Sequence, residues 1–122
     1  MRIIITATSP SIDSNVDPRF GRCVYLLMVD TESLQWEAQA NPGVNASGGA
    51  GIQAAQFATD QKVEAVLSGD FGPNAYNALQ AAGIAMYLFG ACTSVRDAIE
   101  NFKAGQLEHV GAPTGPGHHR RG

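Results

Sequence analysis

A nearly continuous apolar run at the start of the chain constrains the fold more than any other feature. Residues 2–7, RIIITA, contain three consecutive isoleucines and are rich in β-branched side chains. Strands that are buried on both faces show such runs, whereas half-exposed strands alternate apolar and polar residues. The run therefore predicts a buried central strand.

The hydrophobic pattern changes from strand-like to helical near the middle of the chain. Residues 23–30, CVYLLMVD, predict a second strand, and residues 34–39 alternate as a half-exposed third strand should. Pro73 in a first helical turn, and Thr93 or Ser94 as an N-cap, support two of the helices that follow. The periodicity predicts helices at 50–58, 73–82 and 95–102 and further strands at 63–67 and 84–89.

The order β-β-β-α-β-α-β-α predicts the sheet. Right-handed crossovers place the last two strands parallel to the first and on its far side. The expected fold class is α/β, a ribonuclease H-like three-layer fold with a five-stranded mixed sheet in the order 3-2-1-4-5, in which strand 2 is antiparallel. The 122 residues suit one domain, expected at residues 1–105. Residues 106–122 have almost no apolar content and are expected to form a flexible C-terminal tail.

Composition argues against several classes of function. The net charge of -3 does not support nucleic-acid binding. There is no apolar run of about 18 residues to span a membrane, and the N-terminal run is too short for a signal peptide, so we expect a cytoplasmic protein. The histidines fall late in the chain and form no Cys/His or Ser/His/Asp arrangement, so we do not expect an enzyme.

A glycine-rich loop leads into the first predicted helix, within residues 41–55, NPGVNASGGAGIQAA. Glycines let a backbone approach a ligand, and the first turn of a helix offers free N–H groups to an anion. In the expected sheet this loop shares an edge with residues 8–22, 69–74 and 90–93, beyond the carboxyl ends of the parallel strands. Ligands bind at that edge in open α/β sheets.

Charged and apolar side chains accompany the glycine loop at this edge. Arg19 and Arg22 add two fixed positive charges, and Phe20 and Phe71 are candidates for apolar walls. This combination suits a compact anion that also tolerates soft contacts. A metal–sulfide cluster and a phosphate group both satisfy the description.

The two cysteines are candidates for soft contacts to such an anion. Cys23 stands at the start of the second strand and Cys92 before the third helix, so the expected topology would open both onto the same edge. At each position a cysteine is more often a small buried hydrophobic side chain than a ligand. The chain has no Cys-x-x-Cys or paired Cys/His spacing for a structural zinc ion.

Two other functions have partial support. Residues 49–54 match G-x-G-x-x-A, and Asp70 follows about 20 residues later, as in dinucleotide-binding folds. However, the motif does not follow its strand through a tight turn, and the chain is too short for two mononucleotide-binding halves. A nuclease of this fold would need carboxylates on the sheet, and residues 2–7 have none. A nucleotide- or phosphate-binding regulatory domain and an interaction subunit without metal remain alternatives.

The chain resembles the nitrogenase iron–molybdenum cofactor-binding family over about residues 1–110. The resemblance rests on the short apolar first strand, DPRFGR at 17–22, GGAG at 48–51, GPNA at 72–75 and AGI at 82–84, in this order. It implies carriage or insertion of a metal–sulfur cofactor. The chain is especially similar to one branch, the small orange proteins of sulfate-reducing bacteria, which hold a molybdenum–copper sulfide cluster non-covalently.

From the residues and the resemblance together, we expect non-catalytic binding of an anionic metal–sulfur cluster. The expected cluster is a molybdenum–copper sulfide or an iron–molybdenum cofactor, and an acceptor or assembly protein is an expected partner. The predicted cofactor-binding residues are Arg19, Phe20, Arg22, Ser47, Gly48, Gly49, Ala50, Gly51 and Phe71, and the predicted metal contacts are Cys23 and Cys92.

Overall fold

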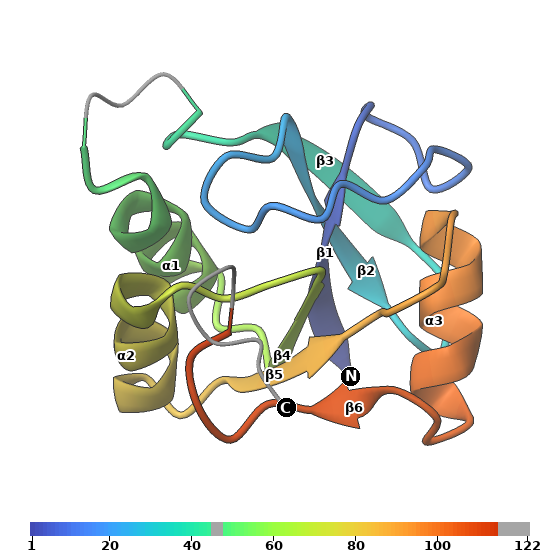
Figure 1. Cartoon of the computed structure of the whole chain (residues 1–122). Coiled ribbons are helices and arrows are strands. Elements are labelled where there is room, and N and C mark those ends of the chain that lie inside the picture. Colours follow the sequence, from blue (N-terminus) through green and yellow to red (C-terminus); the bar gives the residue numbers. More distant parts are fainter. Residues whose placement is uncertain (45–47, 115–122) are drawn as a thin grey trace.

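The computed structural model describes residues 1–44 and 48–114 and shows a mixed sheet with helices on both faces (Figure 1). The strands are β1 (Arg2–Ala7), β2 (Tyr25–Asp30), β3 (Trp36–Ala40), β4 (Ala65–Ser68), β5 (Ala85–Leu88) and β6 (Glu108–His109). The helices are α1 (Ala50–Asp60), α2 (Pro73–Ala81) and α3 (Val95–Lys103). Each expected element is therefore present, with shifts of one or two residues at most ends.

The sheet has the order β3-β2-β1-β4-β5-β6. β2 is antiparallel to both β1 and β3, whereas β4 is parallel to β1 and β5 is parallel to β4. The expected order and directions of the first five strands are confirmed. β1 is central, as its apolar run predicts, and residues 3–7 are buried.

The sheet has six strands, so the expectation of five was wrong. β6 lies within residues 106–122, which we expected to be a flexible tail, and pairs antiparallel with β5. Its two residues are both exposed, so no apolar pattern predicts it. Backbone pairing with β5 and an edge-to-face contact between the rings of His109 and Tyr87 hold the strand. Val110 is buried behind it, and Tyr76 Oη donates a hydrogen bond to the Gly111 carbonyl. The tail expectation is thus corrected for residues 106–114, while residues 115–122 lie outside the described residues.

Two hydrophobic clusters fill the spaces between the sheet and its helices. One joins α1 and α2 to one face of the sheet and includes Ile4, Leu26 and Val66. The other joins α3 to the opposite face and includes Ile3 and Leu27. Neighbouring residues of one strand thus point into different layers, as the twofold repeat of a strand requires. The three-layer arrangement follows.

Long loops gather beyond the carboxyl ends of β1 and β4. The loop after β1 is held there by isolated bridges between Ala7 and Val16 and between Arg19 and Asp70. Residues 41–44, which follow β3, and residues 48–49, which precede α1, lie at the same edge (Figure 1). No described helix has the length and apolar character needed to cross a bilayer.

Candidate anion-binding site

Helices α1 and α2 begin side by side without side-chain caps. Gly49 and Gly72 precede them, neither supplies a capping side chain, and neither helix has an acidic residue in its first turn. The two first turns are in contact, because a Cβ added to Gly51 would lie 3.1 Å from the Cβ of Ala75. Two helix N-termini therefore lie together, and neither a cap nor an acidic side chain satisfies their N–H groups or their dipoles. Such an arrangement attracts anions.

The glycine loop is tightly packed at one point and open at another. A Cβ on Gly43 would lie only 2.5 Å from the carbonyl oxygen of Ala50, so that glycine is required by close backbone approach. No described atom lies within 4 Å of a Cβ built on Gly48 or Gly49. Gly49 needs its glycine for another reason, a φ of 71° in the left-handed region. Neither close packing nor a positive φ explains why position 48 is a glycine. A ligand that approaches the backbone would explain it.

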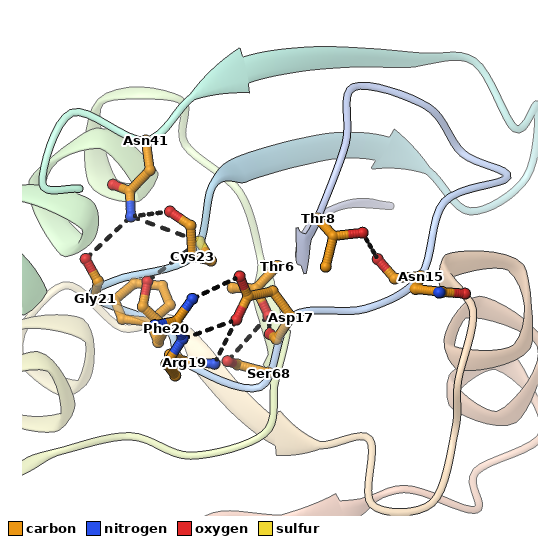
Figure 2. Close-up of polar contacts among 10 residues, drawn as sticks. All are labelled: Thr6, Thr8, Asn15, Asp17, Arg19, Phe20, Gly21, Cys23, Asn41 and Ser68. Atoms are coloured by element: carbon orange, nitrogen blue, oxygen red, sulfur yellow. Dashed lines mark hydrogen bonds and ion pairs between the residues drawn. The ribbon is translucent and has the colours of Figure 1, made fainter.

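Asn41 fastens the glycine loop to the segment before β2 (Figure 2). Its side chain is buried, and Nδ2 donates to the carbonyl oxygens of Gly21 at 3.0 Å and Cys23 at 2.9 Å. Its Oδ1 accepts from the backbone N–H of Gly43 at 2.9 Å. One amide thus holds together the two chain segments that carry the predicted arginines and glycines.

Arg19 and Arg22 differ in their surroundings. The Arg19 side chain is 61% exposed and pairs with Asp17, whose side chain is 4% exposed, at 3.3 Å from Nε to Oδ1. The hydrogen bond to Asp17 and then its negative charge raise the pKa of Arg19. Arg22 is exposed, and its Nη1 donates to the Val44 carbonyl at 3.4 Å, toward the glycine loop. Asp17 therefore offsets part of the charge of Arg19.

A small buried polar network anchors Asp17 at the edge of the sheet. The hydroxyl of Thr6 in β1 donates to the backbone carbonyl of Asp17, and a 3.1 Å hydrogen bond joins the hydroxyls of Thr6 and Ser68. All three residues are buried. The network joins the ends of β1 and β4 to the segment that carries the arginines (Figure 2).

The two predicted aromatic residues lie inside the core. Phe20 and Phe71 are 1% and 0% exposed, and their ring centroids are 5.6 Å apart. They support the loops from below and do not form open walls. Their contact with a cofactor stays a prediction.

Cys23 is a core residue on the α1/α2 face. Its Sγ donates to the Phe20 carbonyl at 3.4 Å and accepts from Asn41 at 3.5 Å. Burial, and then the negative charge of Asp17, raise the pKa of the Cys23 thiol to about 12. Metals bind the thiolate, and this environment opposes thiolate formation.

Cys92 lies on the other face of the sheet. It packs against the α3 cluster, whereas Cys23 is fully buried in the α1/α2 cluster, so the two thiols do not open together onto one edge as expected. Metal contact by either cysteine stays a prediction. Burial and then the charge of Asp97 raise the pKa of Cys92, and Asn101 Nδ2 donates to its sulfur at 3.6 Å. Cys92 lines a separate open pocket of about 510 Å³ between β5 and α3.

The remaining parts of the predicted site are Ser47 and the side chains that could bind a metal. Ser47 lies outside the described residues. Within residues 1–44 and 48–114, no three His, Cys, Asp or Glu side chains are grouped to hold a metal ion. Sequence reasoning missed Asn41 and the buried role of Asp17. The Asn41-Pro42-Gly43 turn signal was available, because an Asn side chain commonly binds the backbone N–H two residues later.

Known proteins match almost the whole folded chain. The sequence model of the family described as dinitrogenase iron-molybdenum cofactor matches residues 1–105. A protein of Methanocaldococcus jannaschii whose function is uncharacterized is 32% identical over 101 residues, which are 80% of this chain and 85% of that protein.

Solved structures show the same fold. The apo form of the orange protein from Desulfovibrio gigas matches with a TM-score of 0.88 and 38% identity, over 93% of this chain and 96% of that chain. A Thermotoga protein solved by NMR and described as a candidate NifB protein has a TM-score of 0.80 and 33% identity, over 93% of this chain and 96% of that chain.

Proposed function

This chain belongs to the dinitrogenase iron-molybdenum cofactor family, and we propose that it binds an anionic metal–sulfur cluster without catalysing a reaction. The binding site in this proposal is the edge formed by the first turns of α1 and α2, Gly48 and Gly49, and the side chains of Arg19 and Arg22. The cluster would be a molybdenum–copper sulfide or an iron–molybdenum cofactor.

One observation carries the proposal. Two neighbouring helices begin at this edge with neither a side-chain cap nor an acidic residue in the first turn, next to open backbone at Gly48. Leaving two helix ends uncapped sacrifices stability that a Ser or Asp would provide. An anion bound between the two ends would satisfy the same donors.

The residues present fit a cluster held non-covalently. Cys23 is buried with a pKa raised to about 12, and Cys92 lies on the other face of the sheet. The described residues offer N–H donors and guanidinium groups, which suit anionic sulfides. We therefore assign charge neutralisation to Arg19, Arg22 and the helix ends, and positioning to Asn41.

The proposal also covers what happens to the cluster after it is bound. We propose that the protein passes its cargo to an acceptor or assembly protein. Similarity to the apo orange protein and to the candidate NifB protein supports a role in handling a cluster.

We also interpret the strand order as ribonuclease H-like. We propose no nuclease chemistry for this fold, because β1 has no carboxylate.

The test is reconstitution of protein purified without oxygen. Tetrathiomolybdate and copper are added, and visible absorption and elemental analysis follow gel filtration. We expect charge-transfer bands and retained molybdenum in the wild type. Arg22→Ala should lower affinity by about tenfold, the equivalent of about 1.4 kcal/mol, and the difference should shrink as salt rises.

Arg96→Ala is the matched control, because Arg96 is also an exposed arginine but lies on α3 and pairs with Asp13. It should bind the cluster like the wild type. Equal losses in both variants would contradict the assigned site. A wild type that retains no molybdenum, copper or iron, but is stabilised by inorganic phosphate or a nucleotide, would favour the phosphate-binding alternative.

A further inference from the structure

β3 forms an outer edge of the sheet, and no described strand pairs with its outer side (Figure 1). Its sequence, WEAQA, contains neither lysine nor proline, the residues that often protect such edges from pairing with another chain. The opposite edge is the two-residue strand β6. β3 is thus the longer of the two edges and the better template for an added strand.

Two hydrogen bonds establish which backbone groups of β3 point outward. Asn41 N–H donates to the Val24 carbonyl at 3.1 Å, and Asp30 N–H donates to the Gln35 carbonyl at 2.9 Å. Residues of an antiparallel strand bond to the inner neighbour alternately. Positions 35, 37, 39 and 41 therefore face β2, and positions 36, 38 and 40 present their N–H and C=O groups to the outside.

We propose that β3 pairs antiparallel with β3 of a second copy of this chain, around a two-fold axis at Ala38. Trp36 of each copy then lies opposite Ala40 of the other, and Ala38 lies opposite its own equivalent. All three outward-facing positions take part, which gives about six backbone hydrogen bonds. The Ala40 carbonyl already accepts from Gln39 Nε2 at 3.3 Å, and its second lone pair is sufficient for the new bond.

Charge and side-chain size select this register. With the axis at Ala38, Glu37 lies opposite the neutral Gln39 of the other copy. Moving the axis to residue 37 would place two Glu37 carboxylates opposite each other, which is destabilising, and would leave Ala40 unpaired. Moving the axis to residue 39 would place Trp36 opposite residue 42, beyond the end of β3. The axis at Ala38 is therefore the register that pairs all three outward-facing positions without a like-charge pair.

The face shared with α3 contributes apolar contact. Trp36 and Ala38 are paired with Val29 and Leu27 of β2, whose side chains belong to the α3 cluster. Trp36 is 39% exposed, and in the dimer its indole would cover the small side chain of Ala40 in the other copy. A single strand pair with one tryptophan per copy is a small interface, so we expect weak, concentration-dependent association.

Sedimentation equilibrium of the full chain from about 1 µM to about 1 mM tests the proposal. The protein has a single tryptophan, so emission from Trp36 reports on the interface directly. We expect a monomer–dimer equilibrium and a blue shift of emission with concentration. A monomer at every concentration would overturn the proposal.

Substitutions at Gln39 test the register with little risk to folding, because its side chain is exposed. Gln39→Lys faces Glu37 of the other copy at two symmetric positions and should tighten the dimer about fivefold, whereas Gln39→Glu should weaken it about fivefold. Equal effects of the two variants, or effects of the opposite sign, would refute this pairing of β3 strands.

Discussion

The two faces of the sheet use their helix ends in opposite ways. On one face α3 begins with Ser94, whose hydroxyl accepts from the backbone N–H of Asp97, and Asp97 adds a carboxylate to the first turn. On the other face α1 and α2 begin with glycines and no cap. The end of α3 is satisfied within the chain, whereas the ends of α1 and α2 keep their donors available.

This difference places the capped helix in one layer and the two uncapped helix ends, which form the proposed binding site, in the other. On the α3 face, Asp97 in the first turn and Lys103 in the last turn of α3 complement the helix dipole. The α1/α2 face replaces caps with close backbone packing at Gly43 and Gly51. Such packing holds the helix ends in place without consuming the N–H groups that an anion needs.

Thiol reactivity should show the largest contrast between the faces. At about pH 9 a Cys23 thiol with a pKa of about 12 is thiolate in only about one molecule in a thousand. Cys92 is only partly buried and should react with iodoacetamide at least about tenfold faster in the folded protein. Mass spectrometry of alkylated peptides measures both rates, and equal rates before unfolding would contradict the burial of Cys23.

The raised pKa of Cys23 also predicts an alkaline effect on stability. Folding favours the protonated thiol, so this contribution to stability is present below about pH 9 and is lost as the pH rises toward about 12. Cys23→Ala should be less stable near neutral pH but should show a shallower alkaline decline in free energy of unfolding. Urea titrations at several pH values, compared with Cys92→Ala, check this sign.

Gly43→Ala should lower the free energy of unfolding by about 2 kcal/mol, because the new Cβ would meet the Ala50 carbonyl at 2.5 Å. Gly48→Ala is the matched variant in the same loop, and it should change stability by less than about 0.5 kcal/mol. If a cluster approaches the backbone at this loop, Gly48→Ala should still weaken its retention. Urea unfolding and metal analysis separate the two effects.

Ser94→Ala should lower the free energy of unfolding by about 1 kcal/mol, since it removes the only side-chain cap among the three described helices. Cluster retention should not change, because α3 begins outside the proposed site. A loss of retention equal to that of Arg22→Ala would mean that the two faces are not independent. Urea unfolding and reconstitution measure the two quantities.

Ile52→Glu should change stability less than Gly43→Ala does, and it should separate stability from binding most clearly. Ile52 is 49% exposed in the first turn of α1, so a carboxylate there should stabilise the helix by about 0.3–1 kcal/mol. The same charge should weaken binding of an anionic cluster. Ile52→Gln is the control without charge, and it should leave the affinity nearly unchanged; reduced affinity in both would attribute the loss to the isoleucine itself.

Much of the fold could be predicted from local patterns. The isoleucines of β1 require burial on both faces, and the helical spacing after residue 50 requires helices that cover them. A cap at Thr93 or Ser94 was recognisable from residue type and position, and the structure uses Ser94. β6 could not be predicted, because backbone pairing with β5 is its main support and its own side chains are exposed.

The candidate site was predictable in its residue types but not in its geometry. The glycines and arginines were identified from the sequence, because an uncapped helix start and a fixed charge are local properties. Contacts between distant segments decided the rest: Asn41 binds residues 18 and 20 positions away, Asp17 offsets Arg19, and the two cysteines fall on opposite faces. The sequence alone thus determined which groups are available, whereas only the tertiary structure decided which of them are buried, paired or left open to a ligand, since burial and pairing depend on neighbours that only folding brings together.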